Sequence, residues 1–166
     1  GGKTDACEPG FQAGMQKAAS AMFPLLCGAS GIGTIGQVEG CLTFSPLQLT
    51  LDAEMVRYLR RMLAGFEITP ETLALEQIRK VGPEGNFISE PHTAASFRKE
   101  FWLSGLTECL SWDVYRSRPV RGMERLAEEK ARDILTRPLE PVLDEHQLAE
   151  IDRITAHAEK TILAKS

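Results

Sequence analysis

The sequence predicts an α/β fold in which this chain is mostly helical and adds only a few short strands. Helical patterns cover most of the 166 residues, and two short extended runs lie among glycines before residue 46. Two strands cannot form a stable sheet alone, so they need partners. The simplest arrangement is the end of a (β/α)₈ barrel, which needs about 250 residues, followed by a helical extension. We therefore assign residues 1–66 to the last βα units of a barrel and residues 67–166 to a C-terminal helical extension.

The first predicted helix opens at Pro9 and is interrupted by Pro24. Its expected buried face is apolar and consists of Phe11, Met15, Ala18, Ala19, Met22 and Leu26. The first extended run, Ala29–Gly36, belongs to a stretch with four glycines in nine residues, which indicates a close approach of the backbone to another group. The second run is Gly40–Ser45. Each run is expected to be a strand followed by a helix.

The remaining elements are predicted to be helices. Asp52 is expected to cap the most regular one, which ends at Gly65. Thr69, Pro70 and Glu71 form a helix start, because threonine caps well and proline fits the first helical position. The pattern then predicts helices over about residues 70–81, 93–109, 121–136 and 145–164. The last helix is expected to bury Leu148, Ile151, Ile154, Ala158 and Ile162.

Composition excludes several classes of protein. The net charge is −4, from 19 basic and 23 acidic residues, with no basic cluster, so we expect no nucleic-acid partner. No apolar run approaches the roughly 20 residues of a membrane span, and no signal peptide is apparent. The four cysteines are irregularly spaced, which predicts free thiols in a reducing cytoplasm and no metal site. The glycine-rich opening without Met favours a chain that begins partway through a longer protein.

Four segments of the sequence carry a resemblance to a known family. They are GKTDA (2–6) with QAGMQKA (12–18), GQVEGCLTFS (36–45), QLTLDAE (48–54), and residues 66–102 with VGPEGNF (81–87) and His92-Thr93. In order and spacing they resemble the last third of the trimethylamine methyltransferase family of corrinoid-dependent enzymes. The resemblance implies a cytoplasmic (β/α)₈ methyltransferase that moves a methyl group from a methylated amine to the Co(I) corrinoid of a separate protein. No cofactor is expected to bind this chain directly, and the isolated fragment is expected to be inactive.

The resemblance also bears on the methyl donor. Some family members use trimethylamine and contain pyrrolysine close to the segment that matches residues 1–5. An ordinary lysine, Lys3, stands in this segment. This favours the branch without pyrrolysine, which acts on quaternary amines such as glycine betaine, although the alignment of Lys3 with that position stays open.

Candidate substrate-binding residues follow from what a quaternary ammonium needs. Its charge is permanent, so a carboxylate or aromatic faces must replace lost water. Sites in this fold lie at the C-terminal ends of strands. The candidates are Glu39 as the carboxylate, Gln37 and Thr43 as hydrogen-bonding groups, Phe44 as an aromatic wall, and His92. Each has a structural alternative: a capping or salt-bridging role in a loop for Glu39, structural roles at a strand end for Gln37 and Thr43, core packing for Phe44, and a backbone hydrogen bond for His92.

A second reading of the whole chain stays open. The glycine-rich segment can be a simple loop in a non-catalytic helical protein-interaction domain. Trp102, Trp112 and Tyr115 are expected to anchor the helical tail, and the last two can instead form a docking face for the corrinoid protein. Because unpaired strand edges and apolar faces invite pairing with another chain, we also expect a homo-oligomer.

Overall fold

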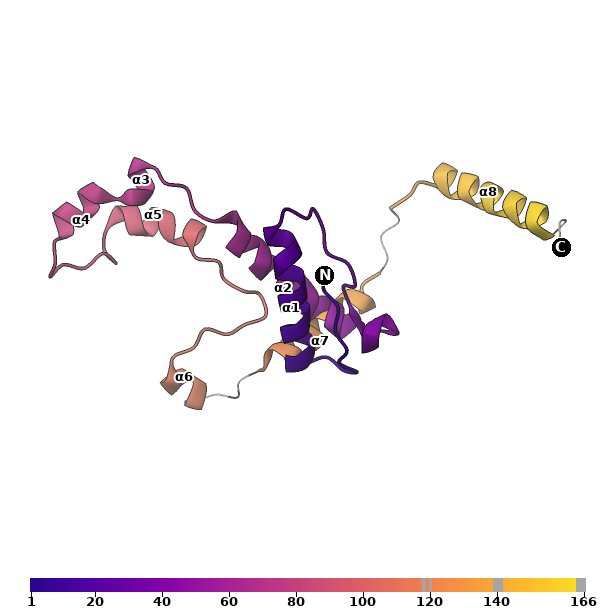
Figure 1. The fold of residues 1–166 in the computed structure, drawn as a ribbon, viewed down its shortest axis with the longest axis horizontal. Coiled ribbons are helices and arrows are strands. Elements are labelled where there is room, and N and C mark those ends of the chain that lie inside the picture. Colours follow the sequence, from indigo (N-terminus) through magenta and orange to yellow (C-terminus); the bar gives the residue numbers. More distant parts are fainter. Residues whose placement is uncertain (118, 120, 139–141, 164–166) are drawn as a thin grey trace. The chain divides into compact units, whose positions relative to one another are not determined.

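Figure 1 shows the computed structural model of the chain, which describes residues 1–117, 119, 121–138 and 142–163. Two compact units are distinguished, Gly1–Ile134 and Leu135–Ser166. The elements in order are α1 (Phe11–Leu26), β1 (Gln37–Val38), the 3₁₀ turn η1 (Glu39–Cys41), β2 (Thr43–Phe44), α2 (Pro46–Ala64), α3 (Pro70–Leu73), α4 (Leu75–Val81), α5 (Pro91–Glu100), α6 (Trp112–Ser117), α7 (Met123–Thr136) and α8 (Glu145–Leu163). The prediction of a mostly helical chain with short strands is confirmed.

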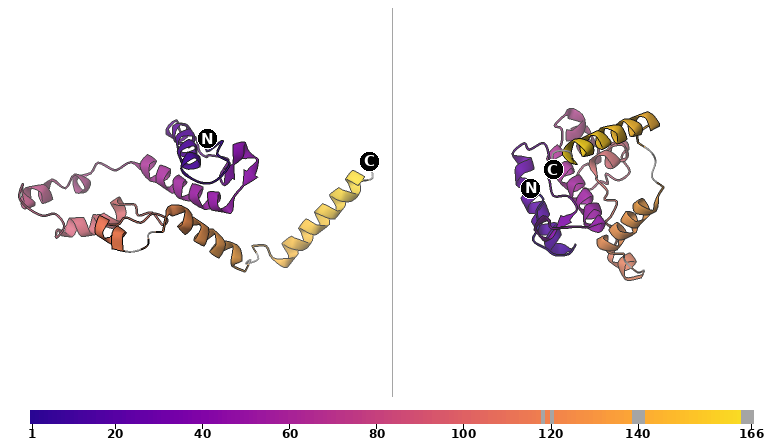
Figure 2. Two further views of the ribbon diagram at one scale, coloured as in Figure 1. Left: turned by 90° about the horizontal axis from the view of Figure 1, so that it is seen from below. Right: turned by 90° about the vertical axis from the view of Figure 1, so that its right-hand side faces the viewer.

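Helices α1 and α2 pack against each other and lie side by side in both figures (Figures 1 and 2). The expected buried face of α1 is wrong. The buried residues are Ala13, Lys17 and Ala21, each four positions apart, while Phe11 is 85% exposed. Small side chains allow α1 to approach its neighbours closely, so its alanine face is the covered one. The larger apolar residues are left on the open side.

The start of α2 also differs from the prediction. Ser45, rather than Asp52, is the N-cap, and its hydroxyl accepts a hydrogen bond from Gln48 N at 3.2 Å. Pro46 occupies the first helical position, where its missing N–H is not needed. Asp52 lies within the helix and is buried. The sequence pattern placed the helix start seven residues too late, at Asp52 instead of Ser45, because the helix opens with Pro46-Leu47, which also fits a loop.

The two strands form one antiparallel hairpin around η1, with Gln37 opposite Phe44 and Val38 opposite Thr43. The predicted strand at Ala29–Gly36 is not formed, whereas the second predicted run, Gly40–Ser45, contains β2 and is followed by α2 as expected. The expected close approach at the glycines is confirmed at Gly36. Its φ is 78°, and a Cβ there would lie 2.6 Å from the Phe44 ring.

Two of the later predicted helices are shorter or broken. The 70–81 helix is split into α3 and α4 by Ala74, which adopts a left-handed conformation with φ 50°. Its start is as predicted, because Thr69 caps α3 and exchanges hydrogen bonds with Thr72. The 93–109 helix is wrong beyond Glu100, where α5 ends. The following segment leaves the helix because Ser104 and Gly105 bind a side chain of α2.

Two expectations about packing are also wrong. Along α8, all residues from 145 to 163 are exposed within their unit, including the predicted buried stripe. Trp112 and Tyr115 stack on each other with 5.5 Å between ring centroids, but both are exposed rather than anchored in a core. Trp102 does pack: its ring lies edge-on against the Tyr58 ring, with 4.2 Å between the ring centroids. The division of the chain at residue 66 describes roles in a barrel and stays a prediction.

Candidate functional site

The N-terminal segment lies beside the hairpin. From residue 2 to residue 6, burial alternates: Gly2, Thr4 and Ala6 are buried, and the residues between them are exposed. This period of two is typical of an extended strand with one covered face. The backbone oxygens of Ala6 and Thr4 accept hydrogen bonds from Glu39 N at 2.7 Å and Gly40 N at 3.0 Å. The hairpin tip is therefore held by the segment that contains Lys3.

The same segment also lies beside the residues before the hairpin. The backbone of Gly2 is so close to Gly33 that a Cβ on Gly2 would lie 2.6 Å from the Gly33 oxygen. The Thr34 hydroxyl lies 3.5 Å from the Gly1 oxygen. Gly1 and Gly2 therefore lie near residues 33–34 and Ala6 lies near Glu39, but residues 33–36 are not extended, because Thr34 and Gly36 have φ values of 60° and 78°. The N-terminal segment thus lies along the loop and the hairpin that precede α2, without forming a strand pair with them.

Glu39 stands at the tip of the hairpin and is exposed. Its carboxylate accepts a hydrogen bond from the Thr43 hydroxyl at 2.7 Å. Its φ is 53°, and the left-handed conformation costs a non-glycine residue about 1 to 2 kcal/mol. Such strain is held in place by surrounding contacts and is frequent at functional sites. Here the contacts are the backbone bond to Ala6 and the flanking strand pairs.

The structure brings four of the five predicted site residues together. Gln37, Glu39, Thr43 and Phe44 all belong to the hairpin, and Phe44 is 58% exposed, so it is not a core residue. His92 lies elsewhere, at the start of α5. Its Nε2 lies 2.8 Å from the backbone oxygen of Glu71, as in the structural alternative for this histidine. Whether any of the five binds substrate stays a prediction.

A buried polar cluster between α1 and α2 is absent from the sequence-based site. Lys17 Nζ and Asp52 Oδ2 form a fully buried ion pair at 2.8 Å. Asp52 Oδ2 also accepts a hydrogen bond from Gly36 N at 2.7 Å. The other carboxylate oxygen, Oδ1, accepts one from Gln48 Nε2 at 2.7 Å. Lys17 also donates to the Thr34 backbone oxygen at 2.8 Å. This cluster fixes the loop that leads into β1 and so positions the hairpin.

A second buried carboxylate, Glu54, holds the segment after α5 against α2. It accepts hydrogen bonds from the Ser104 hydroxyl at 2.5 Å, Gly105 N at 2.9 Å and Arg57 at 2.7 Å. Burial alone would raise the pKa of Glu54. The hydrogen bonds from Ser104, Arg57 and Gly105 outweigh it, so the pKa is lowered from its ordinary value. Glu54 thus stays ionised and acts as a structural anchor.

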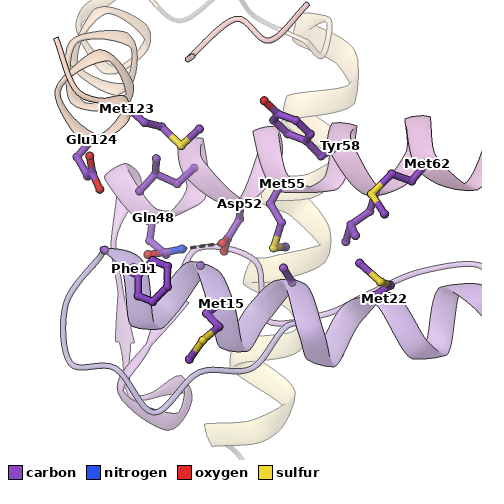
Figure 3. A pocket seen from close by; sticks show the side chains of 15 residues that line it. Phe11, Met15, Met22, Gln48, Asp52, Met55, Tyr58, Met62, Met123 and Glu124 are labelled. Carbon is purple, nitrogen blue, oxygen red and sulfur yellow. Dashed lines mark hydrogen bonds between the residues drawn. The ribbon is translucent and has the colours of Figure 1, made fainter. Parts of the chain in front are cut away.

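A cavity of about 480 Å³ opens between α1, α2 and the start of α7 (Figure 3). Its walls are predominantly apolar and include Phe11, Met15, Met22, Met55, Tyr58, Met62 and Met123. Gln48, Asp52 and Glu124 add polar groups. A volume of this size lies within the range of small-ligand pockets, but it equally fits the side chains of a packed helix.

Among residues 1–117, 119, 121–138 and 142–163, no three His, Cys, Asp or Glu side chains are grouped so that they could hold a metal ion. None of the helices in these ranges combines the length and apolar character of a bilayer-crossing segment.

Comparison with protein families gives a match over nearly the whole chain. The family model described as trimethylamine methyltransferase matches residues 1–162. The chain belongs to this family. Its match includes the N-terminal segment, the hairpin and both buried carboxylate clusters.

Individual members of the trimethylamine methyltransferase family show the extent of the similarity. The chain is 30% identical to trimethylamine methyltransferase MttB2 of Methanosarcina mazei over 162 residues, which is 96% of this chain and 32% of that protein. It is 38% identical to trimethylamine methyltransferase MttB of Desulfitobacterium hafniense over 100 residues, 60% of this chain and 20% of that protein. It is 24% identical to a glycine betaine methyltransferase of the same species over 98% of this chain and 34% of that protein. The chain therefore spans about a third of the length of these relatives.

In this family member, the segments that suggested the family contain the buried polar residues. Lys17 stands in the first segment, and Gln48, Asp52 and Glu54 stand in the third. The available signal was a charged residue flanked at four-residue spacing by Ala13 and Ala21, since small residues on one helix face indicate a close contact. Sequence reasoning read the larger residues as the core and so missed the ion pair.

Proposed function

We propose that the full-length protein is a methyltransferase that moves a methyl group from a methylated or quaternary amine to the Co(I) corrinoid of a partner protein. The family match and the relatives named for trimethylamine and glycine betaine support a methylated amine as donor. The corrinoid is carried by the separate protein, and no residue of this chain is assigned to it. The reaction is proposed to take place in the cytoplasm, and the isolated fragment, about a third of a family member, is proposed to be inactive.

The observation that carries this proposal is the family match over residues 1–162, and the path of the backbone before α1 and α2 is compatible with it. Residues 2–6 lead into α1, and residues 33–38 lead through the hairpin into α2. Parallel strands followed by helices are the repeating unit of a (β/α)₈ barrel, whose sites lie at the C-terminal ends of strands. We propose that residues 1–66 form the last such units and that the remaining strands lie in the rest of the full-length protein.

The chemistry at the hairpin suits a methylated ammonium. Glu39 offers an exposed carboxylate held by Thr43, and the exposed Phe44 ring lies on the same hairpin. An ammonium group gains about 0.5 to 2 kcal/mol from a contact with an aromatic face. In the proposal, Glu39 attracts the cation while Phe44, with Gln37 and Thr43, orients it so that one methyl group faces the corrinoid.

A methyl-transfer assay of the full-length protein tests the proposal. Glycine betaine and trimethylamine are supplied separately with a Co(I) corrinoid, and methylation of the corrinoid is followed by its absorption spectrum. We expect turnover with one of the two amines and no turnover with the isolated 166-residue chain. Absence of turnover with either amine and with other quaternary amines would overturn the proposal and favour a non-catalytic interaction domain.

A further inference from the structure

All five methionines of the chain line one cavity. The sequence contains five methionines, and Met15, Met22, Met55, Met62 and Met123 all lie in the wall between α1, α2 and the start of α7. In Figure 3 these side chains are gathered around the space between the two helices. They come from three separate elements, so the clustering results from the fold and not from a local sequence bias.

This wall is apolar and open. Met62 is 61% exposed and Phe11 is even more so. Contiguous exposed apolar surface marks a site of interaction in a soluble protein. Methionine suits such a surface, because its flexible, polarizable side chain adapts to the shape of what covers it.

The same wall contains two hydrogen-bond acceptors that differ in accessibility. Gln48 is 1% exposed, and its Oε1 is buried without a hydrogen-bond partner in the described structure. Its Nε2 donates to Asp52 Oδ1 at 2.7 Å, so the amide cannot be turned around without breaking that bond. A group outside the wall cannot reach this buried oxygen, whereas Glu124, also in the wall, is exposed and offers an accessible acceptor. Whatever covers the cavity should therefore be apolar and carry a donor.

We infer that in the full-length protein this methionine-lined groove is covered by a helix from the part of the polypeptide outside this chain. The covering helix is apolar on one face and carries a donor side chain that reaches the exposed carboxylate of Glu124. The inference rests on the proposed function, in which the chain completes a barrel whose outer layer consists of neighbouring helices. The relatives are about three times as long as the matched stretch, so they contain ample sequence for such a helix. Backbone N–H groups within a helix are already bonded, which is why the donor is a side chain.

Photo-crosslinking of the full-length protein tests the inference. Photo-methionine is close in shape to methionine and replaces it during expression, so it places a reactive group at every methionine of the groove. Cross-linked peptides are mapped by mass spectrometry on an equimolar mixture of ¹⁴N- and ¹⁵N-labelled protein. We expect links from Met15, Met55 or Met62 to one segment outside these 166 residues, within a single isotopic species. Links between ¹⁴N- and ¹⁵N-labelled peptides would assign the groove to a second copy and overturn the inference. Reaction of the groove methionines with water alone, without any cross-linked peptide, would also overturn it, because the groove would then be open to solvent or a small ligand.

A pair of variants gives an independent readout. Met62→Glu places a charge in the groove, whereas Arg60→Glu changes an exposed position on the same helix. In the full-length protein we expect Met62→Glu to lower the melting temperature by several degrees more than Arg60→Glu. Equal melting temperatures would contradict a covered groove. Neither readout depends on amine turnover, so failure of this inference is distinguishable from failure of the proposed function.

Discussion

At the scale of single residues, the position of Glu39 makes its charge separable from its structural contacts. Its carboxylate is exposed and has one side-chain bond, from Thr43. Glutamine retains an oxygen that can accept the same bond. A substitution therefore removes the charge and leaves the hairpin largely intact.

We predict that Glu39→Gln in the full-length enzyme lowers the rate or affinity for a quaternary amine by roughly ten- to a hundredfold. A charge-assisted contact contributes about 1.5–3 kcal/mol, and about 1.4 kcal/mol corresponds to a factor of ten. Methyl-transfer kinetics and a thermal melt measure both effects, with Glu84→Gln, at an exposed loop position, as the control. A fully active variant that melts several degrees lower would instead show a structural role for Glu39.

The ion pair between Lys17 and Asp52 gives the opposite expectation, a large effect on stability. Lys17→Met leaves a buried carboxylate without its cation, and removal of one partner of a buried pair costs about 3–5 kcal/mol. Arg79→Met is the control, because its exposed pair with Glu76 contributes about 1 kcal/mol or less. Chemical denaturation of the full-length protein measures both free energies of unfolding. Comparable small losses would mean that the interior pair is not an anchor.

The grouping of the hairpin residues could be predicted from the sequence, whereas the buried ion pair could not. Gln37, Glu39, Thr43 and Phe44 are close in sequence, so a turn was enough to bring them together. Lys17 and Asp52 are 35 residues apart. Their pairing depends on how α1 packs on α2, which no local pattern specifies. His92 was grouped with the hairpin on its residue type alone, and the structure gives it a different neighbour.

At the scale of elements, Glu54 makes the docking of residues 102–107 on α2 dependent on pH. Its pKa in the folded protein lies below the ordinary value of 4.5, so the carboxylate stabilises this docking fully above that pH. The stabilisation is lost as the pH falls through the lowered pKa. Trp102 reports on the docking because its ring lies against Tyr58 of α2.

We predict an acid transition below about pH 4.5 in the ¹⁹F NMR signal of 5-fluorotryptophan at position 102, assigned with Trp102→Phe. Glu54→Gln should remove this transition, because the glutamine oxygen can still accept from Ser104 and Gly105, the bond from Arg57 is lost at every pH, and the amide does not titrate. The signal of residue 112 is the internal control. An unchanged transition in Glu54→Gln would assign the effect to another group.

Element boundaries were predictable where a local signal decides them. Thr69 and Pro70 marked a helix start correctly, and Gly82 marked the end of α4. The helix expected over residues 93–109 failed because Ser104 and Gly105 bond to Glu54, 50 and 51 residues away in the sequence. The pattern of α8 predicted its helix but not its exposure, since burial depends on what lies against it.

At the scale of the whole molecule, the exposed apolar surface leads to an expectation about assembly. Phe11, Leu42, Phe66 and Ile88 are each at least 80% exposed. We predict that the isolated 166-residue chain self-associates, because exposed apolar patches and the free edges of the hairpin favour pairing. Light scattering over micromolar concentrations measures the mass, and the full-length protein is the comparison. A monomer at every concentration would contradict the prediction.

The gathering of every methionine of the chain in one groove has a consequence for oxidative damage. Methionine sulfoxide is polar, so oxidation converts an apolar surface into a polar one, and reductases reverse the change. In most proteins such lesions are scattered. In this chain all five fall on the same surface between α1, α2 and α7, so methionine oxidation would be concentrated on that one surface while the carboxylate at the hairpin tip keeps its chemistry.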